Sequence, residues 1–239
     1  MAAKLKSILR PIHWSLAFKA ALFAVAWLVL PAWAFVLVAF YLYCVPRFQA
    51  LRFGFPFLAL LVLLVTEPPR AVGAFFAGVA WYLLLGTKDM AFMEKRTPHA
   101  ALVLLIVFLM CVRFFSRFSS WDRPEVFVYA FAVGAAFFLL CRGFLLHTAS
   151  FKRRTENTRR GLLGFGIAAA LVWELLLATV FLPLNFLYQS ALLFIASAVL
   201  FDVALNYAHE ELIPRKTLLD FSAFFVLLVI LLGSAKWAL

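Results

Sequence analysis

Nine runs of apolar residues occupy almost the whole chain, and the short segments between them hold most of its charges. Hydrophobic residues make up 67% of the 239 residues and charged residues 14%, against roughly half and about a quarter in soluble domains. No stretch is polar enough, over a sufficient length, to fold in water as a separate domain. Lipid offers no hydrogen-bond partners to the backbone, so each segment that crosses a membrane must be a helix. We therefore expect an all-α, polytopic membrane bundle, with residues 1–239 forming a single transmembrane domain.

The apolar runs predict about nine transmembrane helices. Their ranges are 14–30, 32–45, 53–66, 71–86, 98–113, 125–146, 161–182, 186–208 and 218–236. Several of them reach only about 21–24 Å as helices, whereas a hydrocarbon core is roughly 30 Å thick. Such short helices require protein neighbours or a thinner bilayer. The span 161–182 is rich in Gly and Ala, which allow close helix contact, so we expect it to be the central helix.

Residues 14–45 form either one long helix that kinks at Pro31 or a tight helical hairpin that turns there. Cytoplasmic segments of membrane proteins carry an excess of Lys and Arg, so the charge distribution can decide between the two. With nine spans and a cytoplasmic N-terminus, 17 of the 22 Lys and Arg residues lie inside; the five outside are Arg70, Arg113, Arg117, Arg123 and Lys236. A single kinked helix gives a poorer division, with 13 residues on one side and 9 on the other. The charges therefore predict the hairpin, with the N-terminus inside and the C-terminus outside.

Two cytoplasmic segments flank the membrane spans in this topology. Residues 1–13 form a basic, amphipathic lead-in to the first helix. Residues 147–160 form a basic loop that we expect to contact anionic lipid headgroups or an acidic partner. Its basic residues are Lys152, Arg153, Arg154, Arg159 and Arg160. Residues 152–160 of this loop have no interleaved aromatic residues, which argues against nucleic acid as a partner. The topology suits a prokaryotic cytoplasmic (inner) membrane.

Two acidic residues fall inside predicted spans, where an ionisable group is costly and points to a function. Glu174 lies about 12 Å from the outer end of its helix. Asp202 begins a polar face with Asn206, His209 and Glu210, which follow at i+4, i+7 and i+8 and so share one side of a helix.

This polar face has two interpretations. A carboxylate beside an imidazole can exchange protons near neutral pH, which would make the face a proton- or cation-handling site. Alternatively, Arg142 lies at a similar predicted depth and forms an ion pair with Asp202, which neutralises both charges. For Glu174, a functional carboxylate and an ion pair with Arg113 or Arg117 remain equally open.

The segment Glu210-Glu211-x-x-x-Arg215 resembles the first motif of intramembrane CAAX-type proteases. That family also requires downstream histidines, and this chain has none after His209, so the resemblance implies no metal site here. The four histidines show no metal-binding spacing, and no cofactor motif is recognisable. We therefore predict neither a metal nor a cofactor.

Three functions remain open. A small transporter, carrier or translocation component for a lipid-like or small solute would use Glu174 and the Asp202 face for coupling. A non-catalytic scaffold or anchor subunit would join other membrane subunits, or further copies of itself, through its short spans and basic loops. An intramembrane enzyme is the weakest of the three, because no catalytic cluster is recognisable. We expect the chain not to be an enzyme.

Overall fold

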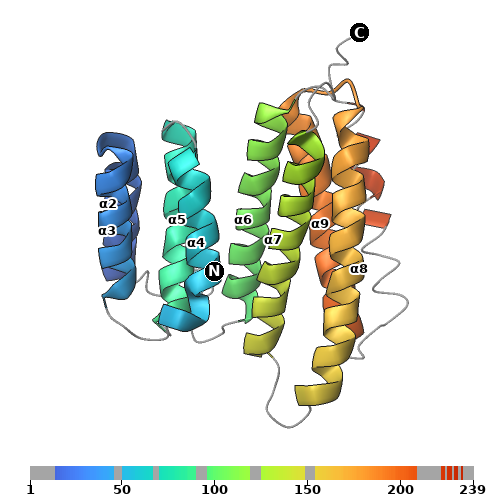
Figure 1. Ribbon diagram of the computed structural model, residues 1–239, viewed down its shortest axis with the longest axis horizontal. Helices are drawn as coiled ribbons and strands as arrows, with labels where there is room; N and C mark the ends of the chain where they lie inside the picture. Colours follow the sequence, from blue (N-terminus) through green and yellow to red (C-terminus); the bar gives the residue numbers. More distant parts are fainter. Residues whose placement is uncertain are drawn as a thin grey trace, which may run out of the picture. The chain divides into compact units, whose positions relative to one another are not determined.

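The computed structural model consists of α-helices and one short 3-10 helix, with no β-strand among its described residues (Figure 1). Those residues are 14–45, 50–66, 70–89, 96–118, 125–148, 154–208, 222–223, 225–227, 229–230 and 233. The helices are α2 (Trp14–Val29), α3 (Ala32–Cys44), η1 (Ala50–Phe53), α4 (Gly54–Thr66), α5 (Ala71–Lys88), α6 (Arg96–Arg117), α7 (Glu125–Thr148), α8 (Arg154–Val180) and α9 (Phe186–Ala208). The first eight predicted ranges are thus confirmed as helices. The lead-in 1–13 and most of the range 218–236 lie outside the described residues.

Four described helical segments are long and apolar enough to cross a membrane. They are Thr97–Arg117, Glu125–Leu146, Arg159–Val180 and Phe186–Ala208. Shorter apolar helices cover Trp14–Val29, Ala32–Cys44, Ala50–Thr66 and Val72–Lys88. The chain thus has the helices of an integral membrane protein. The count of nine spans and the orientation of the termini stay predictions.

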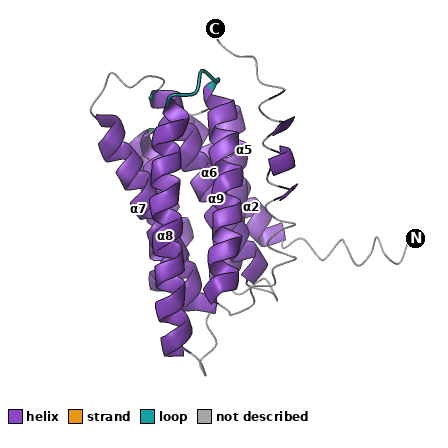
Figure 2. Cartoon of the chain, turned by 90° about the vertical axis from the view of Figure 1, so that its right-hand side faces the viewer, coloured by secondary structure: helices purple, strands orange, loops and turns teal. Residues whose placement is uncertain are grey.

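Helix contacts divide the chain into two compact units, Met1–Leu102 and Val103–Leu239. In the first unit, α2 contacts α3 and α5, and α4 contacts the same two helices, so the four helices close into a ring. In the second unit, α8 contacts both α7 and α9 and lies between them (Figure 2). The prediction that this Gly- and Ala-rich helix is central is therefore confirmed for the second unit.

The segment 14–45 is a hairpin and not one kinked helix. The Phe23 and Phe35 ring centroids lie 5.2 Å apart, whereas twelve residues of continuous helix would separate them by about 18 Å. The Lys19 Nζ atom donates a hydrogen bond of 3.3 Å to the Val45 carbonyl, near the far end of the second helix. The turn falls at Pro31, which lacks an N–H group to continue α2.

Aromatic side chains fill the centre of the first unit. The Phe23 ring stacks on Trp81 at 3.8 Å with an interplanar angle of 5°, which joins α2 to α5. The Tyr43 ring stacks on Phe57 at 4.1 Å, which joins α3 to α4. Each of these pairs connects two neighbours in the ring of helices, so the aromatic core determines which helices lie side by side.

Glycines allow α8 to approach both of its neighbours closely. A Cβ atom on Gly134 of α7 would lie 3.2 Å from the Trp173 Cβ atom. On the other side, a Cβ atom on Gly164 would lie 3.1 Å from the Tyr207 ring of α9. Because both distances are shorter than ordinary contacts, larger residues at these two positions would push the helices apart.

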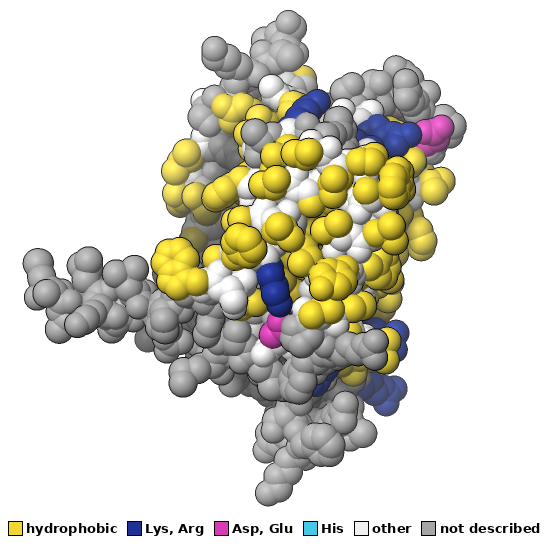
Figure 3. All heavy atoms as spheres, turned by 90° about the vertical axis from the view of Figure 1, so that its left-hand side faces the viewer, with side chains coloured by type: hydrophobic (Ala, Val, Ile, Leu, Met, Phe, Trp, Pro, Cys, Tyr) yellow, Lys and Arg dark blue, Asp and Glu magenta, His cyan; other side chains and the backbone are white. Residues whose placement is uncertain are grey.

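Large hydrophobic side chains are exposed over much of the surface. Figure 3 shows one face on which hydrophobic side chains predominate among the described atoms. On α2, for example, Phe18 is 70% exposed and Val29 is 73% exposed. An exposed apolar surface of this extent is expected where a protein faces lipid.

The basic segment 147–160 differs from the predicted loop. Helix α7 continues to Thr148 and α8 already begins at Arg154, so nine of the 14 residues of the segment are helical. The predicted boundaries of the loop were the ends of the apolar runs, which mark where a helix leaves the lipid. A helix, however, can continue into water, because its hydrogen bonds lie within the segment itself.

A glycine substitution tests the contact between α2 and α5. A Cβ atom on Gly73 would lie 3.0 Å from the Trp27 ring, and that buried ring is held by a 2.8 Å hydrogen bond from its Nε1 atom to the Leu64 carbonyl. We expect Gly73→Ala to lower the free energy of unfolding by about 1–3 kcal/mol because of overpacking. Thermal unfolding in detergent micelles, followed by circular dichroism, measures this loss.

Gly78→Ala is the matched control on the same helix. Its Cβ atom would lie 3.5 Å from the Ala24 Cβ atom, which is an ordinary contact. We expect this variant to be as stable as the wild type or slightly more stable, since Ala favours helix over Gly. Equal losses for both variants would contradict the packing described.

Candidate functional site

Glu174 lies on α8, six residues before its C-terminal residue Val180, and its side chain is exposed. The positions one turn away on the same helix hold Ala170, Leu171, Leu177 and Ala178, none of which can donate a side-chain hydrogen bond. No hydrogen bond or ion pair joins Glu174 to another described residue. The alternative ion pair with Arg113 or Arg117 is therefore absent from the described contacts.

Small residues flank Glu174 along the exposed side of α8. Ala170 and Ala178, four residues before and after it, are both exposed. Gly166 is half-buried, and a Cβ atom at this position would meet no atom within 4 Å. These four residues recur at intervals of four and so form one face of the helix, which we call the Glu174 stripe. Neither α7 nor α9 fills it, in contrast to the faces that carry Trp173 and Gly164.

The Asp202 carboxylate is bonded along its own helix. The Asn206 Nδ2 atom donates to Asp202 Oδ2 at 2.8 Å, as their i, i+4 spacing allows. Asp202 is half-buried and Asn206 is buried. The structure thus brings together the first two members of the predicted polar face, whereas His209 and Glu210 lie outside the described residues.

Arg142 lies on α7 with its side chain exposed, and no contact with Asp202 occurs among the described residues. The predicted pairing rested on similar depth in the membrane. Depth along a helix does not fix the direction of a side chain around it, and the rotation of α7 leaves Arg142 on the surface.

The basic residues that were predicted to contact lipid headgroups lie partly on α8. Arg154 begins this helix, Arg159 is exposed and Arg160 is half-buried. Lys152 and Arg153 lie outside the described residues. The described part thus places basic residues along the first two turns of α8, and their contacts with lipid stay predictions.

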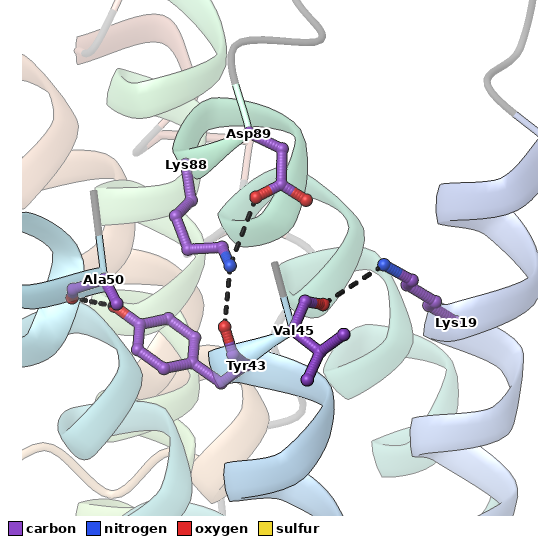
Figure 4. Close-up of polar contacts among 6 residues, drawn as sticks. All are labelled: Lys19, Tyr43, Val45, Ala50, Lys88 and Asp89. Carbon is purple, nitrogen blue, oxygen red and sulfur yellow. Dashed lines mark hydrogen bonds and ion pairs between the residues drawn. The ribbon is translucent and has the colours of Figure 1, made fainter. Parts of the chain in front are cut away.

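A buried lysine near the ends of α3 and α5 was not anticipated (Figure 4). The Lys88 side chain is 0% exposed. Its Nζ atom donates to the Tyr43 carbonyl at 2.6 Å, lies 3.1 Å from Asp89 Oδ1 and lies 5.1 Å from the centre of the Tyr43 ring. The Tyr43 hydroxyl in turn donates to the Ala50 carbonyl at 2.5 Å. The Lys88 bond to the Tyr43 carbonyl and the Lys19 bond to the Val45 carbonyl thus satisfy carbonyl groups that the end of α3 leaves unpaired.

In the predicted topology Lys88 is simply one of the Lys and Arg residues on the cytoplasmic side. The available signal was the adjacent pair Lys88-Asp89 at the end of an apolar run, since a buried lysine needs a carboxylate and acceptor groups nearby. Which carbonyl it meets depends on the packing of α3 against its neighbours, and the sequence does not contain that information.

In the second unit, a buried glutamine likewise bonds carbonyl groups at the end of a helix. The Gln189 Nε2 atom donates to the Thr179 and Leu182 carbonyls, both at 3.0 Å, at the C-terminal end of α8. Asn185 accepts a 3.3 Å hydrogen bond from the Leu187 N–H group at the start of α9. Side chains on both sides of the turn at Pro183 and Asn185 therefore fix its conformation.

Within the described part of the chain, no group of three or more His, Cys, Asp or Glu side chains lies close enough together to hold a metal ion. The three cysteines are free; Cys44 is exposed, and Cys111 and Cys141 are buried. A comparison of the chain with protein families, curated proteins and solved structures finds no match.

Replacement of Lys88 by Met tests whether the lysine stabilises the fold by bonding the end of α3. The variant leaves the Tyr43 carbonyl and the Asp89 carboxylate without their cation, and a buried polar group without a partner costs about 1–3 kcal/mol. We expect a loss of that size in the free energy of unfolding. The double variant K88M/D89N should recover part of it, because the unpaired carboxylate is then gone as well.

Lys19→Met provides the comparison, since its 3.3 Å bond lies at an exposed position. We expect its effect to stay within about 0.5 kcal/mol. Thermal unfolding of all variants in the same detergent gives the comparison. A Lys88→Met protein as stable as Lys19→Met would show that the buried lysine contributes nothing to stability.

The variants Asp202→Asn and Arg142→Gln test the two interpretations of the polar face. Because Arg142 is exposed and does not contact Asp202, we expect the losses of the two single variants to add in the double variant, within about 0.5 kcal/mol. If the double variant is no less stable than Asp202→Asn alone, the two side chains form an ion pair after all. Unfolding measurements on all three proteins decide between the outcomes.

Proposed function

We propose that this chain is a non-catalytic, multi-pass membrane subunit that assembles with other membrane-embedded chains through the Glu174 stripe of α8. The observation that carries this proposal is the exposed Glu174 side chain, which lies in the apolar part of α8, six residues before the end of the helix. An ionisable side chain within a membrane helix is costly. Such a cost is expected where the group contacts a partner, and helix α8 itself supplies none.

Four of the polar side chains buried inside the two units support a static bundle. Lys88 and Gln189 each bond to carbonyl groups at helix ends. The Thr179 and Ser190 hydroxyls donate to carbonyls four residues back on their own helices, at 2.6 Å in both cases. These groups are engaged with the backbone of their own chain, as in a scaffold, and are not available to coordinate a passing solute.

A carrier for a lipid-like or small solute is the second candidate. It is favoured by the absence of a cation beside Glu174 in the described contacts, because a carboxyl group that is not paired with a cation is available to a solute or a coupling ion. In this case Glu174 takes part in the coupling of transport. Asp202, bonded to Asn206, contributes less.

The proposal includes the orientation with a cytoplasmic N-terminus in a prokaryotic inner membrane. In that orientation the residues Lys152, Arg153, Arg154, Arg159 and Arg160 face the cytoplasmic leaflet and contact anionic headgroups. The charge asymmetry of the sequence supports this arrangement.

The size of the protein in native membranes tests the scaffold. We expect the tagged wild type, solubilised in mild detergent, to migrate on native gels well above its 27.0 kDa chain mass plus detergent. Glu174→Leu should migrate as a monomer while its circular dichroism and thermal unfolding remain those of the wild type. Arg142→Leu is the matched control, because it also removes an exposed ionisable side chain but from α7; it should keep the larger size.

A liposome assay examines the second candidate. Vesicles with a fluorescent phospholipid report transbilayer lipid movement when dithionite quenches the outer leaflet. We expect the wild type and Glu174→Leu to give the rate of empty vesicles. Faster movement that depends on Glu174 would overturn the scaffold in favour of the carrier.

A further inference from the structure

We propose that the first unit, Met1–Leu102, fits a lipid layer thinner than an ordinary bilayer, so that phospholipids with short acyl chains surround it. The inference concerns the lipids around this unit and does not depend on the Glu174 stripe, which belongs to the second unit. It draws on the lengths of the helices in the ring, on the bonds that join their ends, and on the exposed side chains of α3.

The helices of the ring are short, and their ends are defined. Helix α3 has 13 residues and lies between two extended residues, Pro31 and Val45. Helix α4 also has 13 residues, so each of the two reaches about 20 Å. Even α5, with 18 residues, reaches about 27 Å, whereas a hydrocarbon core is roughly 30 Å thick. The undescribed gaps between the helices of this unit, 46–49, 67–69 and 90–95, are too short to contain a further span.

Hydrogen bonds join the ends of these helices to their neighbours. At one end of the ring, the Lys19 Nζ atom of α2 donates to the Val45 carbonyl, directly after α3. At the other end, the Trp27 Nε1 atom of α2 donates to the Leu64 carbonyl, two residues before the end of α4. Lys19 and Trp27 are eight residues apart, which corresponds to about 12 Å of helix. The three helices are therefore held in register and cannot slide along one another to present a longer apolar surface.

One face of α3 carries an aromatic residue near each end and an apolar residue between them. Trp33, Leu37 and Tyr41 follow at intervals of four and so share this face, and they are 71%, 63% and 67% exposed. Trp and Tyr are enriched where the hydrocarbon meets the lipid headgroups. The rise of the helix between Trp33 and Tyr41 is only about 12 Å. The face therefore fits a lipid layer whose two interfaces lie close together.

A thinner bilayer suits this unit better than the other ways of accommodating a short span, which are snorkelling and oligomerisation. Lys88 cannot snorkel, because its side chain is 0% exposed and is bonded to the Tyr43 carbonyl. A protein partner on α3 would give Trp33 and Tyr41 no headgroups to meet. In the second unit, by contrast, α7 and α9 have 24 and 23 residues and reach about 35 Å, so the short chains are preferred around the first unit alone.

Competition between lipids of different chain length tests this inference on the purified full-length protein in liposomes. Single cysteines are placed at Leu37 of α3, Leu58 of α4 and Ile167 of α8, all of which are exposed, in a Cys44→Ser background whose other two cysteines are buried. A fluorophore on each cysteine is quenched by a brominated phosphatidylcholine with eighteen-carbon chains. Unbrominated phosphatidylcholines with fourteen- or twenty-two-carbon chains then compete with the quencher.

We expect the fourteen-carbon lipid to displace the quencher from the labels at 37 and 58 about 2- to 10-fold more effectively than the twenty-two-carbon lipid, because mismatch is costly. The label at 167 is the matched control on a long helix, and we expect it not to favour the fourteen-carbon lipid. Equal preferences at all three positions would overturn the inference, as would no preference at 37 or at 58. A label at 37 that the brominated lipid does not quench would show that protein covers this face of α3, which also overturns it. The size of the Glu174-dependent complex on native gels tests the scaffold separately.

Discussion

Where the end of a helix is buried within the protein, its last carbonyl groups must be bonded by side chains, because water does not reach them. This requirement accounts for two of the buried polar side chains. Lys88 bonds the end of α3 in the first unit, and Gln189 bonds the end of α8 in the second. Both residues come from the helix that packs beside that end or follows it. A single side chain thus fixes where one helix stops and how the next one lies against it.

The second determinant of the architecture is the placement of small residues. Glycines allow α5 to lie close to α2, and α8 to lie close to both α7 and α9; at Gly73, Gly134 and Gly164 a Cβ atom would be crowded. Aromatic rings fill the remaining volume of the first unit, where Phe23 stacks on Trp81. Because apolar side chains gain little from leaving lipid for a protein interior, such close contacts and interhelical hydrogen bonds supply most of the specificity.

The helices could be predicted from hydropathy alone, since a run of apolar residues in lipid has no other stable conformation. The hairpin at Pro31 followed from charge counting and is confirmed by the contact between Phe23 and Phe35. Contacts between side chains of different helices were not predictable in this way. The pairing of Arg142 with Asp202 was inferred from depth, but a contact also requires that both side chains point toward each other. The role of Lys88 was missed for the same reason, because its acceptor lies 45 residues away on another helix.

The two acidic residues within predicted spans differ in whether their own helix supplies a hydrogen-bond partner. Asp202 has Asn206 one turn further along α9, and the amide donates to its carboxylate at 2.8 Å. Glu174 has only alanine and leucine one turn away in either direction, so α8 cannot satisfy it. A lipid tail cannot satisfy it either. The Glu174 carboxyl group lies between two exposed alanines, on a face of α8 that no described neighbour in its unit fills, and the proposed contact with another membrane chain would supply the partner that it lacks among the described residues.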